Sequence, residues 1–167
     1  MWRIKGSYSS GVRDAYNRAK SARAEIIDAA TLVELKLNDF LYLKLAGTDK
    51  HRSELVKNCV LTAEFCTLFQ KWRILRAVLT VSGVEEPGQK EQVTRLKNLI
   101  AMRNAFAHGE LVVDEQSLTA TLYYREGERK ALVIDPTTIS SILSEAMTSF
   151  HWISTLLQKE GDGASEL

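Results

Sequence analysis

The chain has 167 residues, of which 45% are apolar and 26% charged, and its formal net charge is +1 at neutral pH. These values are typical of a soluble globular domain that is long enough to bury a proper core. They exclude a strongly basic surface, so any contact with a nucleic acid must come from a local patch. No apolar run approaches the roughly 18 residues of a membrane span, which predicts a cytoplasmic protein without a membrane partner.

The first predicted element is a helix from about Val12 to Ala46, in which apolar residues recur at helical spacing and which Gly47 ends. A helix of roughly 35 residues would span about 50 Å, so we expect a bend or a break within it. Its first part is rich in basic side chains, which indicate either a solvated face or a surface that contacts RNA. These side chains are Arg13, Arg18, Lys20 and Arg23.

A second helical region is predicted to run to about Val81, with Thr48 or Asp49 as its cap. Residues 62–64 (Thr-Ala-Glu) would cap a new helix after a local break, so the region forms one helix or two. Phe69 and Trp72 lie on its apolar stripe and are expected in the core, not as residues that stack on a ligand. Its small basic cluster predicts an exposed face or a site for a phosphate backbone. The cluster consists of Lys71, Arg73 and Arg76.

Cys59 and Cys66 lie seven residues apart, two helical turns along one face. This spacing matches neither a zinc site nor a disulfide framework, so both are expected to be reduced core residues. Residues 82–90 contain two glycines and a proline and are predicted to be a loop between helices.

A β-hairpin is predicted after residue 116, because residues 117–124 alternate in character, residues 125–128 suit a turn and residues 130–134 return. Tyr123 and Tyr124 must then point to opposite faces, so at most one of them meets the core. Asp135 and Pro136 open a last helix, predicted from Thr137 to Lys159. His151 lies on the flank of that helix and is interpreted as structural.

The most informative stretch runs from Leu96 to Glu110, where an apolar helical stripe leads into Arg-Asn-Ala-Phe-Ala-His-Gly at residues 103–109. Arg103 falls within the apolar face, where a guanidinium needs a partner. Asn104 and His108 stand at i and i+4, about one turn apart on the neighbouring flank. Gly109 is predicted to take the left-handed conformation that ends helices, which places His108 in the last turn.

These groups suit phosphoryl chemistry, because a guanidinium neutralises a phosphate and an imidazole both accepts and gives a proton near neutral pH. The alternative is that Arg103 is a buried ion-pair partner or a subunit contact, and that His108 is a favourable charge at a helix C-terminus. Only Glu110 and Asp114 follow the helix, with no paired acidic spacing, so neither a metal nor a cofactor is expected.

Arg103-Asn104-x-x-x-His108 at the end of an amphipathic helix resembles the motif of the HEPN superfamily (higher eukaryote and prokaryote nucleotide-binding domains). That motif has an arginine, often a polar residue next to it, and a histidine a few positions later. The likeness extends more loosely to the preceding helix, residues 62–81, and to the returning helix, residues 137–159. The resemblance implies a mainly α protein, an up-and-down helical bundle in residues 1–159 with one small β-hairpin between the last two helices. Residues 160–167 would be a flexible tail.

The resemblance also implies a homodimer in which two copies of the motif face each other and cut RNA without metal. Arg103, Asn104 and His108 would be catalytic. The RNA is then the substrate, and the protein would be a toxin of a toxin–antitoxin or defence pair with a cognate antitoxin protein as partner. The alternative is a non-catalytic module that binds a nucleotide or forms a regulatory dimer, and a third is a structural helical subunit with Arg103 at its interface.

Overall fold

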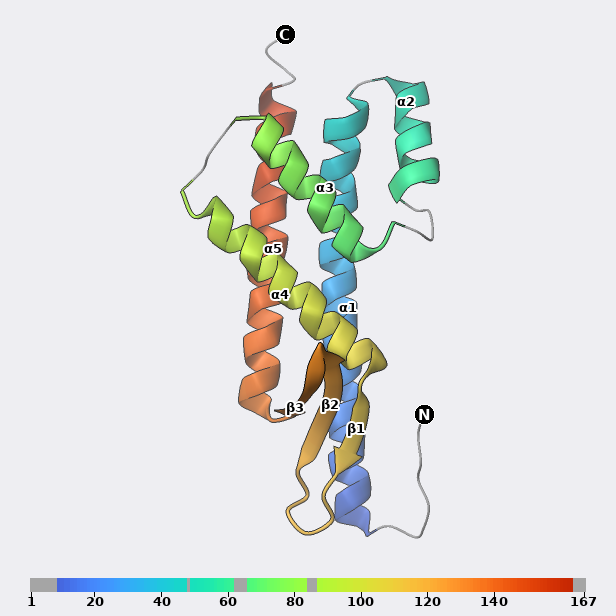
Figure 1. Cartoon of the computed structure of the whole chain (residues 1–167), viewed down its shortest axis with the longest axis vertical. Coiled ribbons are helices and arrows are strands. Elements are labelled where there is room, and N and C mark those ends of the chain that lie inside the picture. Colours follow the sequence, from blue (N-terminus) through green and yellow to red (C-terminus); the bar gives the residue numbers. More distant parts are fainter. Residues whose placement is uncertain (1–8, 48, 62–65, 84–86, 164–167) are drawn as a thin grey trace. The chain divides into compact units, whose positions relative to one another are not determined.

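The computed structural model describes residues 9–47, 49–61, 66–83 and 87–163. In these ranges the chain forms five α-helices, one short π-helix and one three-stranded antiparallel sheet (Figure 1), which confirms a mainly helical fold. The residues belong to two compact units: unit 1 is Met1–Ala30 with Ala101–Ser144, and unit 2 is Thr31–Ile100 with Glu145–Leu167. Among the helices of the described ranges, none combines the length and the apolarity needed to cross a bilayer.

Helix α1 (Ser10–Ala46) has 37 residues and is unbroken, so of the expected bend or break the break was wrong. The physical reason is that no glycine or proline occurs between Val12 and Ala46. Its buried residues recur every three or four positions, so the helix keeps an apolar side in each unit. Gly47 ends it as predicted, with a φ of 62° and an N–H that donates to the Leu43 carbonyl at 3.0 Å.

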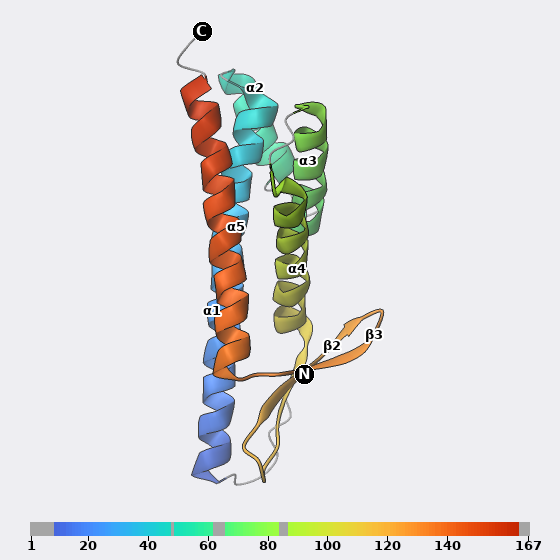
Figure 2. The ribbon, with the colours of Figure 1, turned by 90° about the vertical axis from the view of Figure 1, so that its left-hand side faces the viewer.

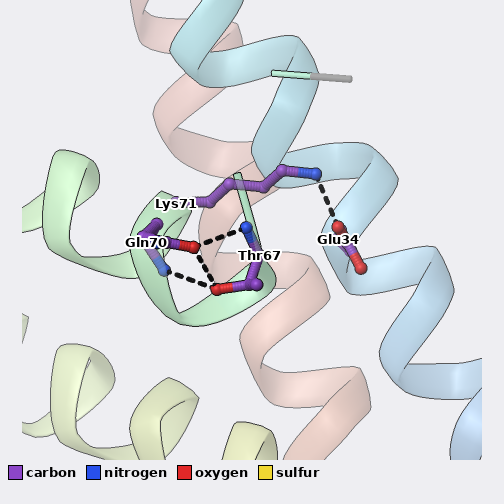
Figure 3. Close-up of polar contacts among 4 residues, drawn as sticks. All are labelled: Glu34, Thr67, Gln70 and Lys71. Atoms are coloured by element: carbon purple, nitrogen blue, oxygen red, sulfur yellow. Dashed lines mark hydrogen bonds and ion pairs between the residues drawn. The ribbon is translucent and has the colours of Figure 1, made fainter. Parts of the chain in front are cut away.

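The second helical region is in pieces: helix α2 (Lys50–Leu55), the π-helix η1 (Val56–Leu61) and helix α3 (Leu68–Val81). The Asp49 carboxylate caps α2 as predicted, because it accepts hydrogen bonds from the backbone N–H groups of His51 and Arg52. A second helix start was also predicted, but the predicted cap at residues 62–64 lies outside the described residues. The cap that is described is Thr67, which shares a capping box with Gln70 (Figure 3).

Helix α3 is fixed within unit 2 by side chains that reach the neighbouring helices. Trp72 is buried as predicted, and its indole N–H donates to the carbonyl of Val93 in helix α4 (Gln89–His108) at 2.9 Å. Phe69 was predicted in the core but is 44% exposed, and it instead stacks on Trp72 with ring centroids 5.3 Å apart. Of the loop predicted at residues 82–90, residues 82, 83, 87 and 88 are outside helices as predicted, α4 begins at Gln89, and residues 84–86 lie outside the described residues.

Of the basic cluster predicted on α3, Lys71 is not part of an exposed face. Lys71 is buried and its ammonium contacts Glu34 of α1 at 2.5 Å (Figure 3). Arg73 and Arg76 are both exposed, and the guanidinium of Arg76 lies over the Trp72 ring, 5.0 Å from its centroid. Lys71 and Arg76 thus contact other residues of unit 2, whereas Arg73 is an exposed residue, since a periodic helix sends neighbouring residues to different sides.

The two cysteines are free, but they differ in environment. Cys66 is buried as predicted, whereas Cys59 is exposed in η1, so the prediction of a core residue was wrong for Cys59. A π-helix has a different turn from an α-helix, and the α-helical spacing that put both on one face does not hold across it.

The sheet of unit 1 has the order β1 (Glu110–Val113), β2 (Ala120–Glu126) and β3 (Glu128–Val133), all antiparallel. Strands β2 and β3 are the predicted hairpin, closed by Gly127 with a φ of 75°. Figure 2 shows this hairpin next to the end of α4, with its turn directed away from the helix. Strand β1 was not predicted, because it is only four residues long and follows α4 directly.

The core of unit 1 joins α1, α4 and the sheet. Its buried members are Ile26, Ala105, Phe106 and Leu122. Tyr124 packs against this core whereas Tyr123 is on the other face, as the alternation predicted. Helix α5 (Pro136–Gly163) begins beside the core at its predicted cap, Asp135, and residues 160–163 of the expected tail are helical.

We expect Lys71→Met to lower the free energy of unfolding by about 2 kcal/mol, because it leaves the Glu34 carboxylate unpaired at a site that is largely closed to water. The Lys71 side chain is 6% exposed and that of Glu34 is 24% exposed. Urea unfolding would measure the change, and adding Glu34→Leu should restore most of the loss. Lys130→Met is the control, since its pair with Glu126 is about half exposed and its loss should change stability much less.

We expect acid stability to depend on Asp135. The N–H of Thr138, donating at 2.7 Å, holds the pKa of Asp135 below its ordinary value. The unfolded chain therefore binds more protons in acid, so this contribution is present above about pH 4 and is lost as the pH falls through the folded-state pKa. Asp135→Asn keeps a cap but does not titrate, so its melting temperature should fall less steeply below about pH 4. A slope equal to that of the parent would contradict this.

Candidate functional site

The last two turns of α4 present the three motif residues near one end of a helix that is anchored in the core of unit 1. Ala105 and Phe106 are buried against Ile26 and Leu122, which fixes the rotation of the helix about its axis. With that side fixed, Asn104 and His108 are exposed and Arg103 is half-buried. The sequence prediction of one flank for Asn104 and His108 agrees with this exposure.

Arg103 lies at the border between the packed and the solvated sides of α4. Its guanidinium Nη1 donates to the Asn104 Oδ1 at 3.1 Å. Among the residues that the structure describes, no carboxylate pairs with it. A half-buried cation without a counter-ion favours an anionic ligand, because its charge is only partly solvated and not neutralised.

His108 is the last residue of α4 and its imidazole is exposed. Within the described parts of the chain the ring has no hydrogen bond and no ion pair, so both nitrogens are open to a ligand. Asn104 stands one turn earlier on the same side, where its amide can act on the same ligand. Arg103 and His108 are five positions apart, about 140° around the axis and roughly 7.5 Å along it. The cation and the imidazole of one chain therefore diverge.

Gly109 ends α4, but not in the way that the sequence predicted. The positive-φ glycines of the described residues are Gly47, Gly83, Gly88 and Gly127, so Gly109 does not take the left-handed conformation. Its N–H still donates to the Ala105 carbonyl, at 2.7 Å. A Cβ at this position would lie 2.5 Å from that oxygen and 2.9 Å from the Tyr123 carbonyl oxygen. Glycine is required by close packing between α4 and β2.

Arg23 of α1 is a residue of this region that the sequence analysis placed on a solvated or RNA-contacting face. Its Nη2 donates to the carbonyl of Ala107, next to His108, at the end of α4 where carbonyls lack helical partners. Nothing in the sequence distinguishes Arg23 from the exposed Arg13 and Arg18, because the partner is 84 positions away. Arg23 is thus a positioning residue for the last turn.

Asp114, which follows β1, stabilises a turn of the chain. Asp114 accepts from the Ser117 N–H at 2.7 Å, from the Ser117 hydroxyl at 2.8 Å and from the Gln116 N–H at 3.1 Å, and the first of these does most to lower its pKa. This turn leads from β1 towards β2. In the described ranges, no three histidine, cysteine, aspartate or glutamate side chains gather into a group that could hold a metal ion.

The arrangement provides one titratable base, one amide and one cation per chain. It fits a reaction in which proton transfer and charge neutralisation occur at a phosphate, provided that a second copy supplies the second imidazole. Comparisons with protein-family models, with curated proteins and with solved structures gave no match to this chain. The functional assignment therefore depends on Arg103, Asn104 and His108 and on what surrounds them.

We expect Gly109→Ala to lower the free energy of unfolding by about 1–3 kcal/mol, because two of the three atoms that crowd its Cβ are backbone oxygens that cannot move aside. Gly11→Ala is the matched control: it adds the same methyl group, but its nearest neighbour is the flexible end of Leu118 at 3.1 Å. That change should leave stability unchanged or raise it, because alanine favours helix. His108→Ala should change the free energy of unfolding by less than about 0.5 kcal/mol. Equal losses in all three variants would contradict the packing role of Gly109.

Proposed function

We propose that this protein is a metal-independent endoribonuclease of the HEPN type, which cuts RNA at a composite site formed by two copies of the chain. The observation that carries the proposal is a set of three groups near the end of α4: an exposed imidazole, an exposed amide and a half-buried guanidinium. Within the described ranges, the imidazole has no partner and the guanidinium has no counter-ion. A cation, an amide and an imidazole that lie near one helix end without a described ion pair are typical of a functional site.

The proposed reaction uses the RNA's own 2′-hydroxyl as nucleophile. His108 of one copy accepts the 2′-hydroxyl proton, the 2′-oxygen bonds to phosphorus, and the bond from phosphorus to the 5′-oxygen breaks. His108 of the second copy gives its proton to the leaving 5′-oxygen. The products carry a 2′,3′-cyclic phosphate and a 5′-hydroxyl, so no water and no metal-bound hydroxide take part in this step.

Arg103 would neutralise the charge that grows on the phosphoryl oxygens, and this stabilisation is largest in the transition state. Asn104, whose Oδ1 accepts from Arg103, would hold the guanidinium and orient the phosphate or the imidazole. Two copies are needed because one imidazole cannot readily be base and acid in the same step. An enzyme of this kind is harmful unless it is controlled, so we include a toxin role and a cognate antitoxin protein in the proposal.

The test is to incubate the purified protein with single-stranded RNA in EDTA and to analyse the ends of the products. Cleavage should continue in EDTA, give 2′,3′-cyclic phosphate ends and spare all-DNA substrates. His108→Ala and Arg103→Ala should each lower the rate by about a hundredfold or more. His151→Ala is the matched control, since it removes another exposed histidine and should cleave like the parent.

The same assay tests the requirement for two copies. An excess of His108→Ala should suppress the parent, since a mixed dimer has one imidazole, and light scattering should report a dimer at micromolar concentration. A monomer that cleaves, inhibition by chelation or 5′-phosphate products would each overturn the mechanism. RNA or nucleotide binding without cleavage would favour a non-catalytic binding module.

A further inference from the structure

The sheet of unit 1 has one face in the core and one face in solvent. The core face carries Leu122, Tyr124 and Leu132. The strand register places alternate residues of all three strands on the opposite side, which we name the outer sheet face. Its members include Val112, Thr121, Tyr123, Arg125, Arg129 and Val133. No described element covers it, and Val112 and Val133 are 42% and 47% exposed.

Two arginines oppose each other on the outer sheet face. Arg125 of β2 and Arg129 of β3 are direct register partners, which brings their Cβ atoms to about 5 Å. Like charges at such a position destabilise a hairpin. Neither arginine has an ion pair within the described residues, and both are exposed. The pair costs stability to the hairpin itself, which favours a role in binding an anion.

The core-facing side of the same hairpin is different. There Lys130 is paired with Glu126 at 2.6 Å, and this carboxylate also raises the pKa of Lys130. Within the described residues, Lys130 on the core-facing side of the hairpin is therefore neutralised by a carboxylate, whereas Arg125 and Arg129 on the outer sheet face are not. Glu110, at the start of β1, is the carboxylate on the outer sheet face, two rungs of the ladder away from the Arg125–Arg129 pair.

Tyr123 provides an aromatic surface beside these cations. The Arg129 guanidinium lies over its ring, 4.8 Å from the centroid. Tyr123 is half-buried, with Glu110 and Ala131 as its register partners. A ring flanked by guanidinium groups on an open sheet can stack on a base while the cations bind the adjoining phosphates.

The outer sheet face also leads directly to the candidate site. Strand β1 begins two residues after His108, and the Cβ position of Gly109 lies 2.9 Å from the Tyr123 carbonyl oxygen. Tyr123 is therefore at the rung where the sheet meets the end of α4. Figure 2 shows the β2–β3 hairpin extending to one side of the end of α4.

We infer that the outer sheet face binds a single strand of RNA and feeds it to His108, with Tyr123 stacking on a base and Arg125 and Arg129 holding phosphates. This inference rests on the proposed function. The occupant is argued from charge and shape: two cations without carboxylates attract a polyanion, and an aromatic ring on a flat, open surface suits a flat base. A protein strand or an acidic peptide would use the cations but would not need the ring.

The test measures binding of a fluorescent single-stranded RNA to the His108→Ala protein, in which cleavage is removed, over a range of salt concentrations. Arg125→Ala with Arg129→Ala should weaken binding at least tenfold and lower the slope of log affinity against log salt by about 0.7 for each cation. Tyr123→Leu should weaken it by about tenfold, whereas Tyr123→Phe should not. Glu110→Gln should tighten it. Arg73→Ala removes an exposed arginine of unit 2 and is the matched control.

The outcomes separate this inference from the proposed function. If the parent cleaves RNA but the sheet variants bind and cleave like the Arg73→Ala control, the outer sheet face is not the RNA surface and the nuclease assignment stands. If RNA binding depends on the sheet residues but the parent never cleaves, the inference stands and the nuclease assignment fails. Loss of binding that Tyr123→Phe shares with Tyr123→Leu, or an acidic peptide that competes fully with RNA, would overturn base stacking. Circular dichroism checks that each variant is folded.

Discussion

The contact between the end of α4 and the backbone of β2 determines the geometry of unit 1. Gly109 brings the Ala105 and Tyr123 carbonyl oxygens so close that only a hydrogen fits at its side-chain position. A helix can therefore pass into a strand without a loop. Everything that follows in unit 1 depends on this approach, because it sets the register of β1 and thereby the face on which each residue of the sheet lies.

The candidate site gains its definition from the same contact. Ala105 and Phe106 fix one side of α4 in the core, and Arg23 donates to the carbonyl of Ala107, the residue before His108. Gly109, the residue after His108, is packed closely against the backbone of β2. The titratable group itself is unconstrained, but the backbone that carries it is bound on three sides. An ordered backbone suits a residue that must contact a ligand at a defined position, because the entropy of ordering that backbone is already lost on folding.

Periodicity was enough to predict the helices, the hairpin and the caps at Asp49 and Asp135, because these depend on residues close in sequence. It failed where a distant part of the chain decides. Strand β1 forms because β2 pairs with it, and Arg23 is not simply solvated because it donates to the carbonyl of Ala107. Glycine is needed at position 109 because the backbone of β2 packs closely against it, not because the position has a positive φ. The relation of Arg103 to Asn104 and His108 was visible in the spacing, but the absence of a described counter-ion for Arg103 was not. Membership in the HEPN superfamily stays a prediction.

The direct passage from α4 to β1 also has an evolutionary consequence. One residue separates the last helical position from the first strand position, so inserting or deleting one residue there would exchange the two faces of β1. Leu111 and Val113 would then meet solvent, and Glu110 and Val112 would be forced towards the core. Selection should therefore remove insertions and deletions around Gly109 and tolerate them at the connection between α3 and α4. Homologous sequences should then align without gaps from the arginine of the motif to the end of β1.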